Sequence, residues 1–231
     1  MLLMGLLEKS LILIPAFNEE DNIAEVLKNC TKYFENILLI DDGSTDKTSE
    51  IAAKFKSVLQ INHCINCGQG TAISTGLNYF INKTNLDYLI TFDADGQHRV
   101  VDALDMIHFA NQYSYDVVFG SRFLNKEKLD AVPYKRRLIL IIAKMFEKLF
   151  YGIKLTDAHN GLRVLNRKAC KNLLNLDCSS MAHSTEIVIK LTKSKLVYSE
   201  YPCKVLYYIN GKLSQSPFNG LNIISDLFQK K

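Results

Sequence analysis

The sequence predicts an α/β fold in which helices cover both faces of a mostly parallel sheet. In the first half of the chain, short apolar runs alternate with amphipathic segments, which is the pattern of strands joined by helical crossovers. Polar clusters rich in Asp, Glu and Asn follow directly after several of the apolar runs. With 231 residues, 48% of them hydrophobic and 23% charged, the chain has the size and composition of a globular α/β protein.

The apolar runs and the segments between them give the expected elements in order. Strands are expected at 10–14, 37–40, 58–61, 88–92 and 116–119. Helices are expected at 19–30, from Ser44 or Thr45 to about 55, at 71–81 and at 101–112. Pro15 is expected to end the first strand, and Asn18 to cap the first helix.

Two aspartates one residue apart, Asp93 and Asp95, follow the fourth apolar run. Because side chains alternate along a strand with a period of two, both carboxylates would leave the strand end on the same side. Mg²⁺ prefers one or two carboxylates together with substrate phosphate oxygens, so the pair indicates a metal and a phosphate-bearing substrate. Asp is also common in turns and at helix caps, which leaves a purely structural role as an alternative.

The polar clusters at the other strand ends favour the functional interpretation. In open parallel sheets, ligands bind in a crevice beyond the carboxyl ends of the strands. We therefore expect the clusters at 15–19, 41–44, 93–97 and 120–122 to converge on one crevice. A helix cap explains one Asp after one strand, but it does not explain acids after three strands and Arg122 after another.

Charge and composition limit the function classes. A formal charge of +4 and a pI near 8.6 are too mildly basic to indicate nucleic acid, but they suit anionic substrates or an anionic membrane face. The six cysteines are scattered and the N-terminus lacks the features of a signal peptide, which favours a cytoplasmic location. No stretch approaches the roughly 18 apolar residues that span a bilayer, so we expect no membrane crossing.

Two cofactor motifs are considered and not favoured. The segment at 63–67, HCINC, could be half of a zinc site or a redox pair, but no second Cys/His pair at zinc-site spacing follows. Gly68, Gly70 and Gly76 do not have the G-x-G-x-x-G spacing of a dinucleotide site, and they follow a loop instead of forming a strand-to-helix turn.

Five segments resemble, in order and spacing, the successive motifs of family 2 glycosyltransferases. They are IPAFNEE at 14–20, LIDDGSTD at 39–46, GQG at 68–70, DADGQH at 93–98 and GSR at 120–122. DAHNGLR at 157–163 and MAHSTE at 181–186 resemble the branch of dolichyl- or polyprenyl-phosphate glycosyltransferases. The match runs from about Ile12 to Asn222, and it implies a GT-A fold.

The resemblance implies a nucleotide-sugar donor, either a GDP-sugar or a UDP-sugar. The residues that would bind it are Pro15, Phe17, Glu19, Asp41, Asp42, Gly70 and Lys212. An aromatic ring offers a stacking face, and carboxylates accept hydrogen bonds from ribose hydroxyls or a base N–H.

A Mg²⁺ or Mn²⁺ site is implied as well, with Asp93, Asp95 and Gln97 as its ligands. The metal would neutralise charge on the departing nucleoside diphosphate. Arg122 would add a bidentate phosphate contact, which Lys would make less well.

The role expected for Glu186 depends on whether the acceptor is a hydroxyl or a lipid phosphate. In many inverting relatives a carboxylate near this position deprotonates an acceptor hydroxyl, whereas a lipid phosphate is already ionised at neutral pH and needs no strong base. Arg163, or the basic run at 135–137, would then hold the acceptor phosphate. The alternative for Glu186 is a solvated acid in the first turn of a helix that runs through Leu191. The candidate catalytic residues are thus Asp95, Glu186, Arg122 and Arg163.

Two segments bear on membrane contact and on donor closure. A helix at 138–150, preceded by the basic run, would pack in the core or lie on anionic lipid. The loop at 210–216, with Lys212, resembles a donor-phosphate loop and would be a lid or an ordinary loop before a helix at 221–228. An Arg that several relatives carry upstream of that loop is missing. Transmembrane hairpins that some relatives append are absent too, so a membrane-protein partner or an amphipathic face would provide the anchor.

We expect one GT-A domain over 1–231, with a nucleotide-sugar-binding half at 10–125, an acceptor-side half at 126–200 and a C-terminal loop and helix at 201–231. The expected activity is metal-dependent, inverting transfer of a sugar to a polyprenyl phosphate at the cytoplasmic membrane face. Transfer to a sugar hydroxyl is the alternative, and a nucleotide-sugar-binding protein without turnover is a third reading. The sequence leaves open the sugar and the base of the donor.

Overall fold

A computed structural model describes residues 2–124, 155–174, 176, 183–206, 208–209 and 212–213. The helices are α1 (Leu2–Glu8), α2 (Ile23–Cys30), α3 (Thr48–Ala52), α4 (Gln69–Lys83), α5 (Val100–Gln112), α8 (Arg167–Asn172) and α9 (His183–Lys193). The strands are β1 (Ser10–Ala16), β2 (Asn36–Asp41), β3 (Val58–Asn62), β4 (Tyr88–Thr91), β5 (Val117–Ser121), β6 (Arg163–Asn166), β7 (Tyr198–Pro202), β8 (Tyr208–Ile209) and β9 (Lys212–Leu213).

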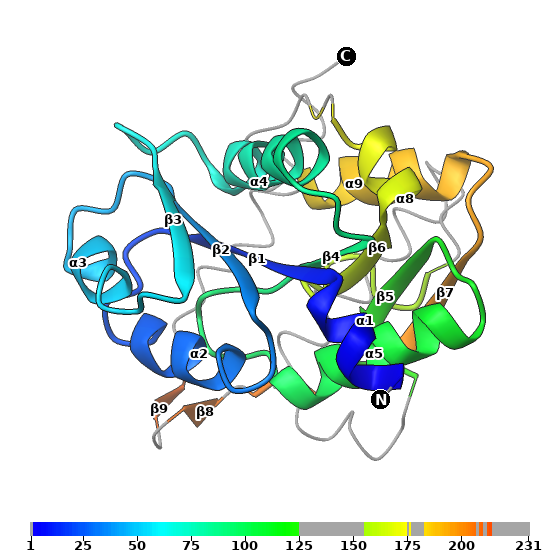
Figure 1. The fold of residues 1–231 in the computed structure, drawn as a ribbon, viewed down its shortest axis with the longest axis horizontal. Coiled ribbons are helices and arrows are strands. Elements are labelled where there is room, and N and C mark those ends of the chain that lie inside the picture. Colours follow the sequence, from blue (N-terminus) through cyan, green and yellow to red (C-terminus); the bar gives the residue numbers. More distant parts are fainter. Residues whose placement is uncertain are drawn as a thin grey trace.

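Seven strands form one mixed sheet in the order β3-β2-β1-β4-β6-β5-β7 (Figure 1). Neighbouring strands are parallel except around β6, which runs antiparallel to both β4 and β5. Every residue of β1 is buried, as expected for a central strand covered on both faces. The predicted fold class is therefore confirmed.

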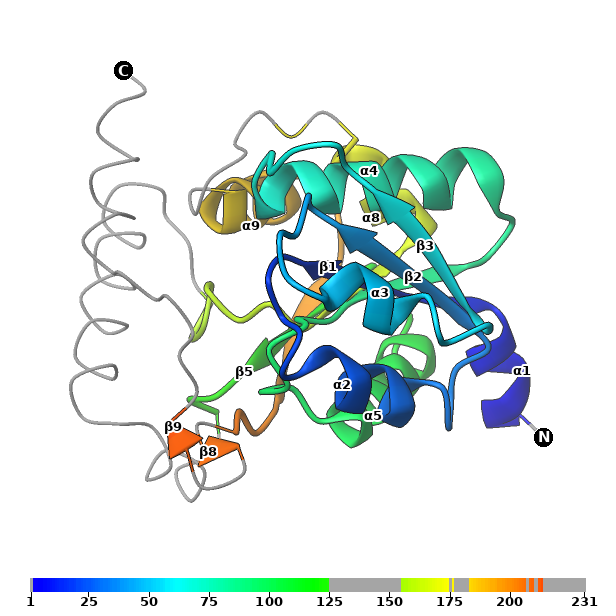
Figure 2. The same cartoon turned by 90° about the vertical axis from the view of Figure 1, so that its left-hand side faces the viewer.

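Alternate residues of β1 feed two separate cores, one on each face of the sheet. Ile12 and Ile14 pack with buried residues of α2 and α5, whereas Leu11 and Leu13 pack with those of α4, α8 and α9. Figure 2 shows these two groups of helices on opposite sides of the sheet. Each fully buried aliphatic side chain contributes roughly 1.5–3 kcal/mol to stability, so the two cores hold the strand ends in a rigid frame.

The prediction that Pro15 ends the first strand is wrong, because β1 continues to Ala16. Pro15 pairs with Ile40 of β2, but β4 pairs with β1 only as far as Leu13 and Thr91. At Pro15 the strand thus has one strand neighbour, and the missing N–H leaves no ladder position unfilled.

The first two helices begin later than predicted because polar side chains hold the preceding turns. Asn18 does not cap a helix; it adopts a positive φ of 54°, and its Oδ1 accepts from Thr45 N at 2.8 Å. Helix α2 starts at Ile23 and α3 at Thr48. Ser44 is likewise not a helix cap, since its Oγ accepts from Asn18 N at 3.0 Å. These contacts tie the end of β1 to the end of β2.

Several elements were not predicted, namely α1, α8, β6, β7 and the short pair β8 and β9. Strand β6 has only four residues, and it pairs with strands about 45 to 75 positions earlier in the chain. Local sequence pattern carries no information about such an insertion. Glu186, by contrast, lies in the first turn of α9, as the sequence predicted.

No helix among the described residues is long and apolar enough to cross a bilayer. The predicted helices at 138–150 and 221–228, the basic run at 135–137 and most of the loop at 210–216 lie outside the described residues.

Arg167 closes the C-terminal end of α4 from across the chain. Its Nη2 donates to Ile81 O at 2.6 Å and to Thr84 O at 2.9 Å, and its Nη1 donates to Leu86 O at 3.0 Å and to Phe80 O at 3.3 Å. Carbonyls at a helix end have no partner within the helix, so a cation that binds several of them stabilises the end.

We predict that Arg167→Ala lowers the free energy of unfolding by about 2 kcal/mol, because hydrogen bonds to a charged group are lost. Urea denaturation measures the change. Lys171 is exposed and lies on α8 with Arg167, and Lys171→Ala should change stability by less than about 0.5 kcal/mol. Equal effects of the two substitutions would contradict the capping role.

Candidate functional site

A cavity of about 310 Å³ lies at the carboxyl ends of β1, β2, β4 and β5. Nine of the predicted site residues line it: Pro15, Phe17, Glu19, Asp42, Asp93, Asp95, Gln97, Arg122 and Arg163. The structure thus brings the strand-end clusters together at one cavity, as the sheet topology predicted. Asp41, Gly70 and Glu186 do not line the cavity, and the side chain of Lys212 is outside the described part of the chain.

The end of β1 supplies an aromatic ring and a carboxylate to the cavity. Phe17 is 41% exposed, which leaves a face of its ring open to a ligand. Glu19 is half-buried, and its Oε2 accepts from Asn22 Nδ2 at 2.8 Å. Burial, with additional repulsion from Asp95 and Asp93, raises the pKa of Glu19 from 4.5 to about 7.

The two aspartates that follow β2 have different surroundings. Asp41 is buried in the turn, where its Oδ1 accepts from the N–H and the hydroxyl of Ser44. Asp42 lines the cavity, and its oxygens accept from Cys67 N at 3.0 Å and Gly68 N at 2.7 Å. Asp42 therefore anchors the segment that leads into α4.

His63 strengthens this anchor. Its Nδ1 lies 2.6 Å from Asp42 Oδ1, and its Nε2 lies 2.9 Å from Thr75 Oγ1 on α4. Ligand atoms of Asp42, His63 and Cys67 lie within 4.8 Å of one another, a grouping that could hold a metal ion. Both ring nitrogens of His63 already have hydrogen-bond partners, so the group works as a clamp on the loop without requiring a metal.

The predicted metal residues lie together after β4. Gln97 is buried and holds Asp95, donating from its backbone N at 3.0 Å and from Nε2 at 2.5 Å. Asp93 Oδ1 accepts from Gln69 Nε2 at 3.2 Å, and Asp93 Oδ2 lies 3.5 Å from His98 Nε2. The two carboxylates are thus held from different sides by neutral amides and a ring nitrogen.

Gly161 leaves the room that Asp93 occupies. A Cβ on Gly161 would lie 2.6 Å from Asp93 Cγ, closer than real Cβ contacts come. The segment is fixed in that position because Thr91 Oγ1 donates to Gly161 O at 2.6 Å and because β6 pairs with β4 directly after it.

The charge of this part of the cavity fits a divalent cation. Glu19, Asp42, Asp93 and Asp95 all line it, and repulsion from Asp95 and Asp93 adds to burial in raising the pKa of Glu19. Carboxylate oxygens are the ligands that Mg²⁺ prefers, and Mg²⁺ is bound in proteins through one or two of them. Asp93 and Asp95 meet that requirement, while Gln97 directs its amide N–H toward Asp95.

Arg122 is held rigidly by Asp157. Its Nε and Nη2 donate to the two oxygens of Asp157 at 2.6 and 2.7 Å, and its backbone N donates to Oδ2 at 3.0 Å. Burial opposes ionisation of Asp157, but the Arg122 guanidinium lowers the pKa of that carboxyl below its usual value. Glu200 of β7 holds the same segment, because its Oε1 accepts from Thr156 N and Asp157 N.

The far side of the cavity carries basic and neutral polar groups. Arg163 is almost fully buried there, and its Nη2 lies 3.4 Å from Ala158 O. His159, and His183 and Ser184 at the start of α9, line the same side. Acids thus follow β1, β2 and β4, whereas the basic groups come from β5, β6 and the segments beside them.

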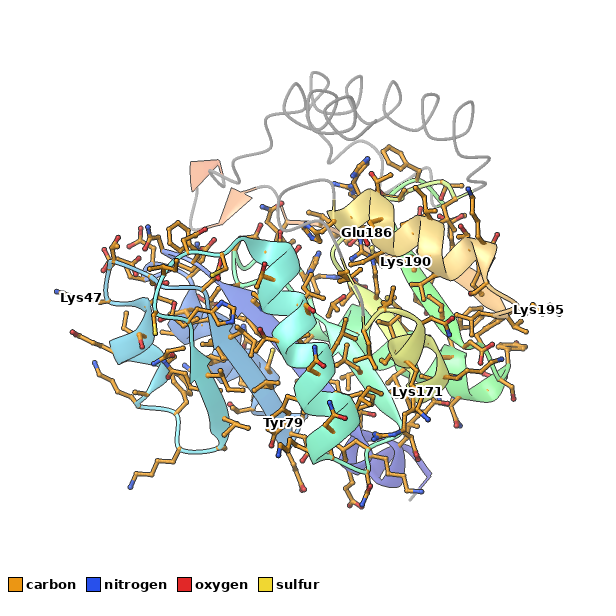
Figure 3. All side chains as sticks on the ribbon, turned by 90° about the horizontal axis from the view of Figure 1, so that it is seen from above. Lys47, Tyr79, Lys171, Glu186, Lys190 and Lys195 are labelled. Carbon is orange, nitrogen blue, oxygen red and sulfur yellow. The ribbon has the colours of Figure 1, made fainter. Side chains whose placement is uncertain are left out.

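Glu186 forms an ion pair with Lys190 and does not line the cavity. Its Oε1 lies 2.7 Å from Lys190 Nζ, one turn further along α9. Figure 3 labels both residues on this helix. Its predicted catalytic role stays a prediction, and the ion pair is the arrangement expected for a structural acid in a first helical turn.

Sequence reasoning missed several residues of the cavity wall. They are Asn66, Gln69, His98, His159, Asn160, Gly161, His183 and Ser184. Seven of them, all except Asn66, lie inside motif segments already singled out, so the motif spacing itself was the signal that could have found them.

We predict that Gly161→Ala weakens Mn²⁺ binding by at least about tenfold, the usual effect of disturbing the support of a metal ligand. The added methyl group must displace the Asp93 carboxylate. Electron paramagnetic resonance of Mn²⁺ titrations measures the affinity. Gly5→Ala is the matched control, since nothing lies within 4 Å of a Cβ at that position. Unchanged Mn²⁺ affinity in the Gly161 variant would exclude Asp93 as a ligand.

The raised pKa of Glu19 predicts that the stability of the metal-free protein depends on pH. Because its pKa rises from 4.5 to about 7 on folding, the folded state binds the proton more tightly than the unfolded state. The stabilising contribution of protonated Glu19 is complete below about 4.5 and is lost as the pH rises through about 7. We expect Glu19→Gln to reduce this loss, measured by urea denaturation in EDTA at pH 5 and 8. Identical pH profiles of both proteins would refute the assignment.

Comparison with known proteins places this geometry in a family. Residues 11–174, more than half of the chain, match the family model described as Glycosyl transferase family 2. An uncharacterised protein of Methanocaldococcus jannaschii is 36% identical over 93% of this chain and 86% of its own length. The UDP-N-acetylglucosamine–dolichyl-phosphate N-acetylglucosaminyltransferase of Methanococcus voltae is 31% identical over 85% of each chain.

The fold agrees with a solved structure of low sequence identity. Glucosyl-3-phosphoglycerate synthase of Mycobacterium tuberculosis, crystallised with Mn²⁺ and UDP, superimposes with a TM-score of 0.72 at 15% identity. The match covers 98% of this chain and 83% of that one. With this fold, the matched family model and the strand-end motifs gathered around one cavity, the chain belongs to glycosyl transferase family 2 and is a nucleotide-sugar glycosyltransferase.

Proposed function

We propose that this enzyme moves a sugar from a UDP-sugar to a polyprenyl phosphate, with inversion at the sugar carbon, at the cytoplasmic face of a membrane. The observation that carries the proposal is the separation of charge in the cavity. Carboxylates gather after β1, β2 and β4, and basic side chains gather from β5 and β6 onward. Such a cavity suits a ligand pair in which a metal-bound diphosphate lies beside a second anion.

The acidic side would bind the donor. Phe17 offers an open ring face for the base, and Glu19 offers a carboxylate for ribose hydroxyls. Asp93 and Asp95 would hold Mg²⁺ or Mn²⁺, which when bound neutralises charge on the departing diphosphate. Arg122, which follows β5 and is fixed by Asp157, also lines the cavity and would orient phosphate oxygens without side-chain rearrangement.

The basic side would bind the acceptor. A phosphate monoester carries about 1.5 to 2 negative charges at neutral pH, so it can attack the sugar carbon without a general base. In that step an acceptor oxygen forms the new bond to the sugar carbon while the bond from that carbon to the diphosphate breaks. Arg163, with His159 and His183 near it on the cavity wall, is the group that would position the attacking phosphate.

The donor base and the acceptor are also supported by the relative from Methanococcus voltae. Its name states a UDP-N-acetylglucosamine donor and a dolichyl phosphate acceptor, and it aligns over most of both chains. A UDP-sugar is therefore favoured over a GDP-sugar for this chain. Sugar transfer to a lipid acceptor also requires the enzyme to reach a membrane surface, by its own contact or through a membrane-protein partner.

Replacing Asp95 tests whether the protein catalyses sugar transfer. We expect wild-type protein with Mn²⁺, UDP-N-acetylglucosamine and polyprenyl phosphate to release UDP, and Asp95→Asn to lower the rate about a hundredfold. Asp105→Asn, an exposed aspartate on α5, should leave the rate unchanged. Donor binding without UDP release, across lipid phosphate and sugar acceptors, would instead support a binding protein.

Glu186 separates the two acceptor classes. With a lipid phosphate acceptor, Glu186→Gln should reduce kcat by less than about tenfold, because no hydroxyl must be deprotonated. Steady-state kinetics with a short-chain polyprenyl phosphate give the value. Loss of nearly all activity would favour transfer to a sugar hydroxyl, with Glu186 as the base.

A further inference from the structure

The loop at 63–68 is built to hold one conformation beside the cavity. Asp42 accepts from Cys67 N and Gly68 N, and His63 joins Asp42 to Thr75 of α4. His63 N also donates to Asp41 O at 2.8 Å. Both ends of the loop are therefore tied to the end of β2.

The middle of the loop packs on Gly43. This glycine has a φ of +71°, and a Cβ there would lie 2.5 Å from Ile65 C and 2.7 Å from Asn66 N. No other residue could occupy the turn without moving the loop. The close packing on Gly43 thus restrains the backbone at Asn66, although the side chain of Asn66 is exposed.

Asn66 lines the cavity, as do Asp42, Ala16 and Phe17. Within the described part of the chain, its side-chain amide has no hydrogen-bond partner. An amide carried by a rigid backbone at a cavity wall is preorganised for a ligand, because little backbone entropy is lost on binding.

We propose that Asn66 reads the hydrogen-bonding edge of the donor base. The inference rests on the proposed function, since it assumes that a nucleoside diphosphate occupies this cavity. The position agrees with that ligand. Gln69 Nε2, three residues further on, donates to Asp93 Oδ1 at 3.2 Å, and Asn66 lies against Gly43, so the loop runs from the proposed diphosphate site toward the end of β2.

The chemistry of the amide suits the uracil edge. Uracil places an N3–H donor beside the O4 acceptor, and an amide provides one acceptor and two donors for such a pair. Guanine presents the same donor and acceptor in N1–H and O6, which an amide can also bind, but its N1–H and exocyclic amine form two adjacent donors that suit a carboxylate, which only accepts. Replacing Asn66 by Asp should therefore move the preference from uracil toward guanine.

The test is calorimetric titration of three probes in the presence of Mn²⁺: UDP, GDP and inorganic pyrophosphate, which lacks a base. Asn66→Ala should weaken UDP binding about fivefold to tenfold, the loss expected for one hydrogen bond, and leave pyrophosphate binding unchanged. Asn66→Asp should weaken UDP further and raise the GDP-to-UDP affinity ratio about tenfold. Asn62→Ala, an exposed asparagine that does not line the cavity, is the matched control and should bind all three probes like wild type.

The outcomes separate the inference from the proposed function. Wild-type binding of UDP and pyrophosphate, with no change of UDP affinity in either Asn66 variant, would overturn the role of Asn66 and leave the proposed function standing. Equal weakening of UDP and pyrophosphate in Asn66→Ala would also overturn it, because the effect would not concern the base. No binding of any probe by the wild-type protein would overturn both.

Discussion

The close approach of Asp93 to Gly161 is the contact on which the site depends. It brings the end of β4 against the segment that leads into β6, so the acidic and basic sides of the cavity meet at one point. The contact exists because β6 is inserted antiparallel between β4 and β5 and because Thr91 binds the carbonyl of Gly161. A side chain at position 161 would separate the two sides.

Rigid support of charged groups is the common feature around that contact. Arg122 is fixed by Asp157, Asp95 by Gln97, and Asp42 by the backbone of the 63–68 loop. Such preorganisation lets fixed dipoles and charges act on a ligand without reorganising during the reaction. The cost is visible at Glu19, whose pKa is raised by burial and by neighbouring carboxylates. A cation bound among these acids would remove part of that repulsion.

The parallel part of the fold was predictable because each strand and helix is a continuous local pattern, and strand ends in parallel sheets meet at one edge. Asp93, Asp42 and Arg122 were found in this way. The insertion of β6 between β4 and β5 was not predictable, since it rests on pairing between distant segments. Pro15 and Asn18 were misread for a related reason: a strand neighbour that ends early and a contact to the β2 turn decide their conformations.

The central claim is that Asp93 and Asp95 hold the metal that binds the donor diphosphate. The most direct measurement is a crystal structure of the protein with Mn²⁺ and UDP, in which anomalous scattering locates the metal. The account predicts a Mn²⁺ ion in direct contact with an oxygen of Asp93 or Asp95 and with diphosphate oxygens. A Mn²⁺ ion bound instead by the Asp42, His63 and Cys67 group, or UDP bound without metal contact to either aspartate, would contradict it.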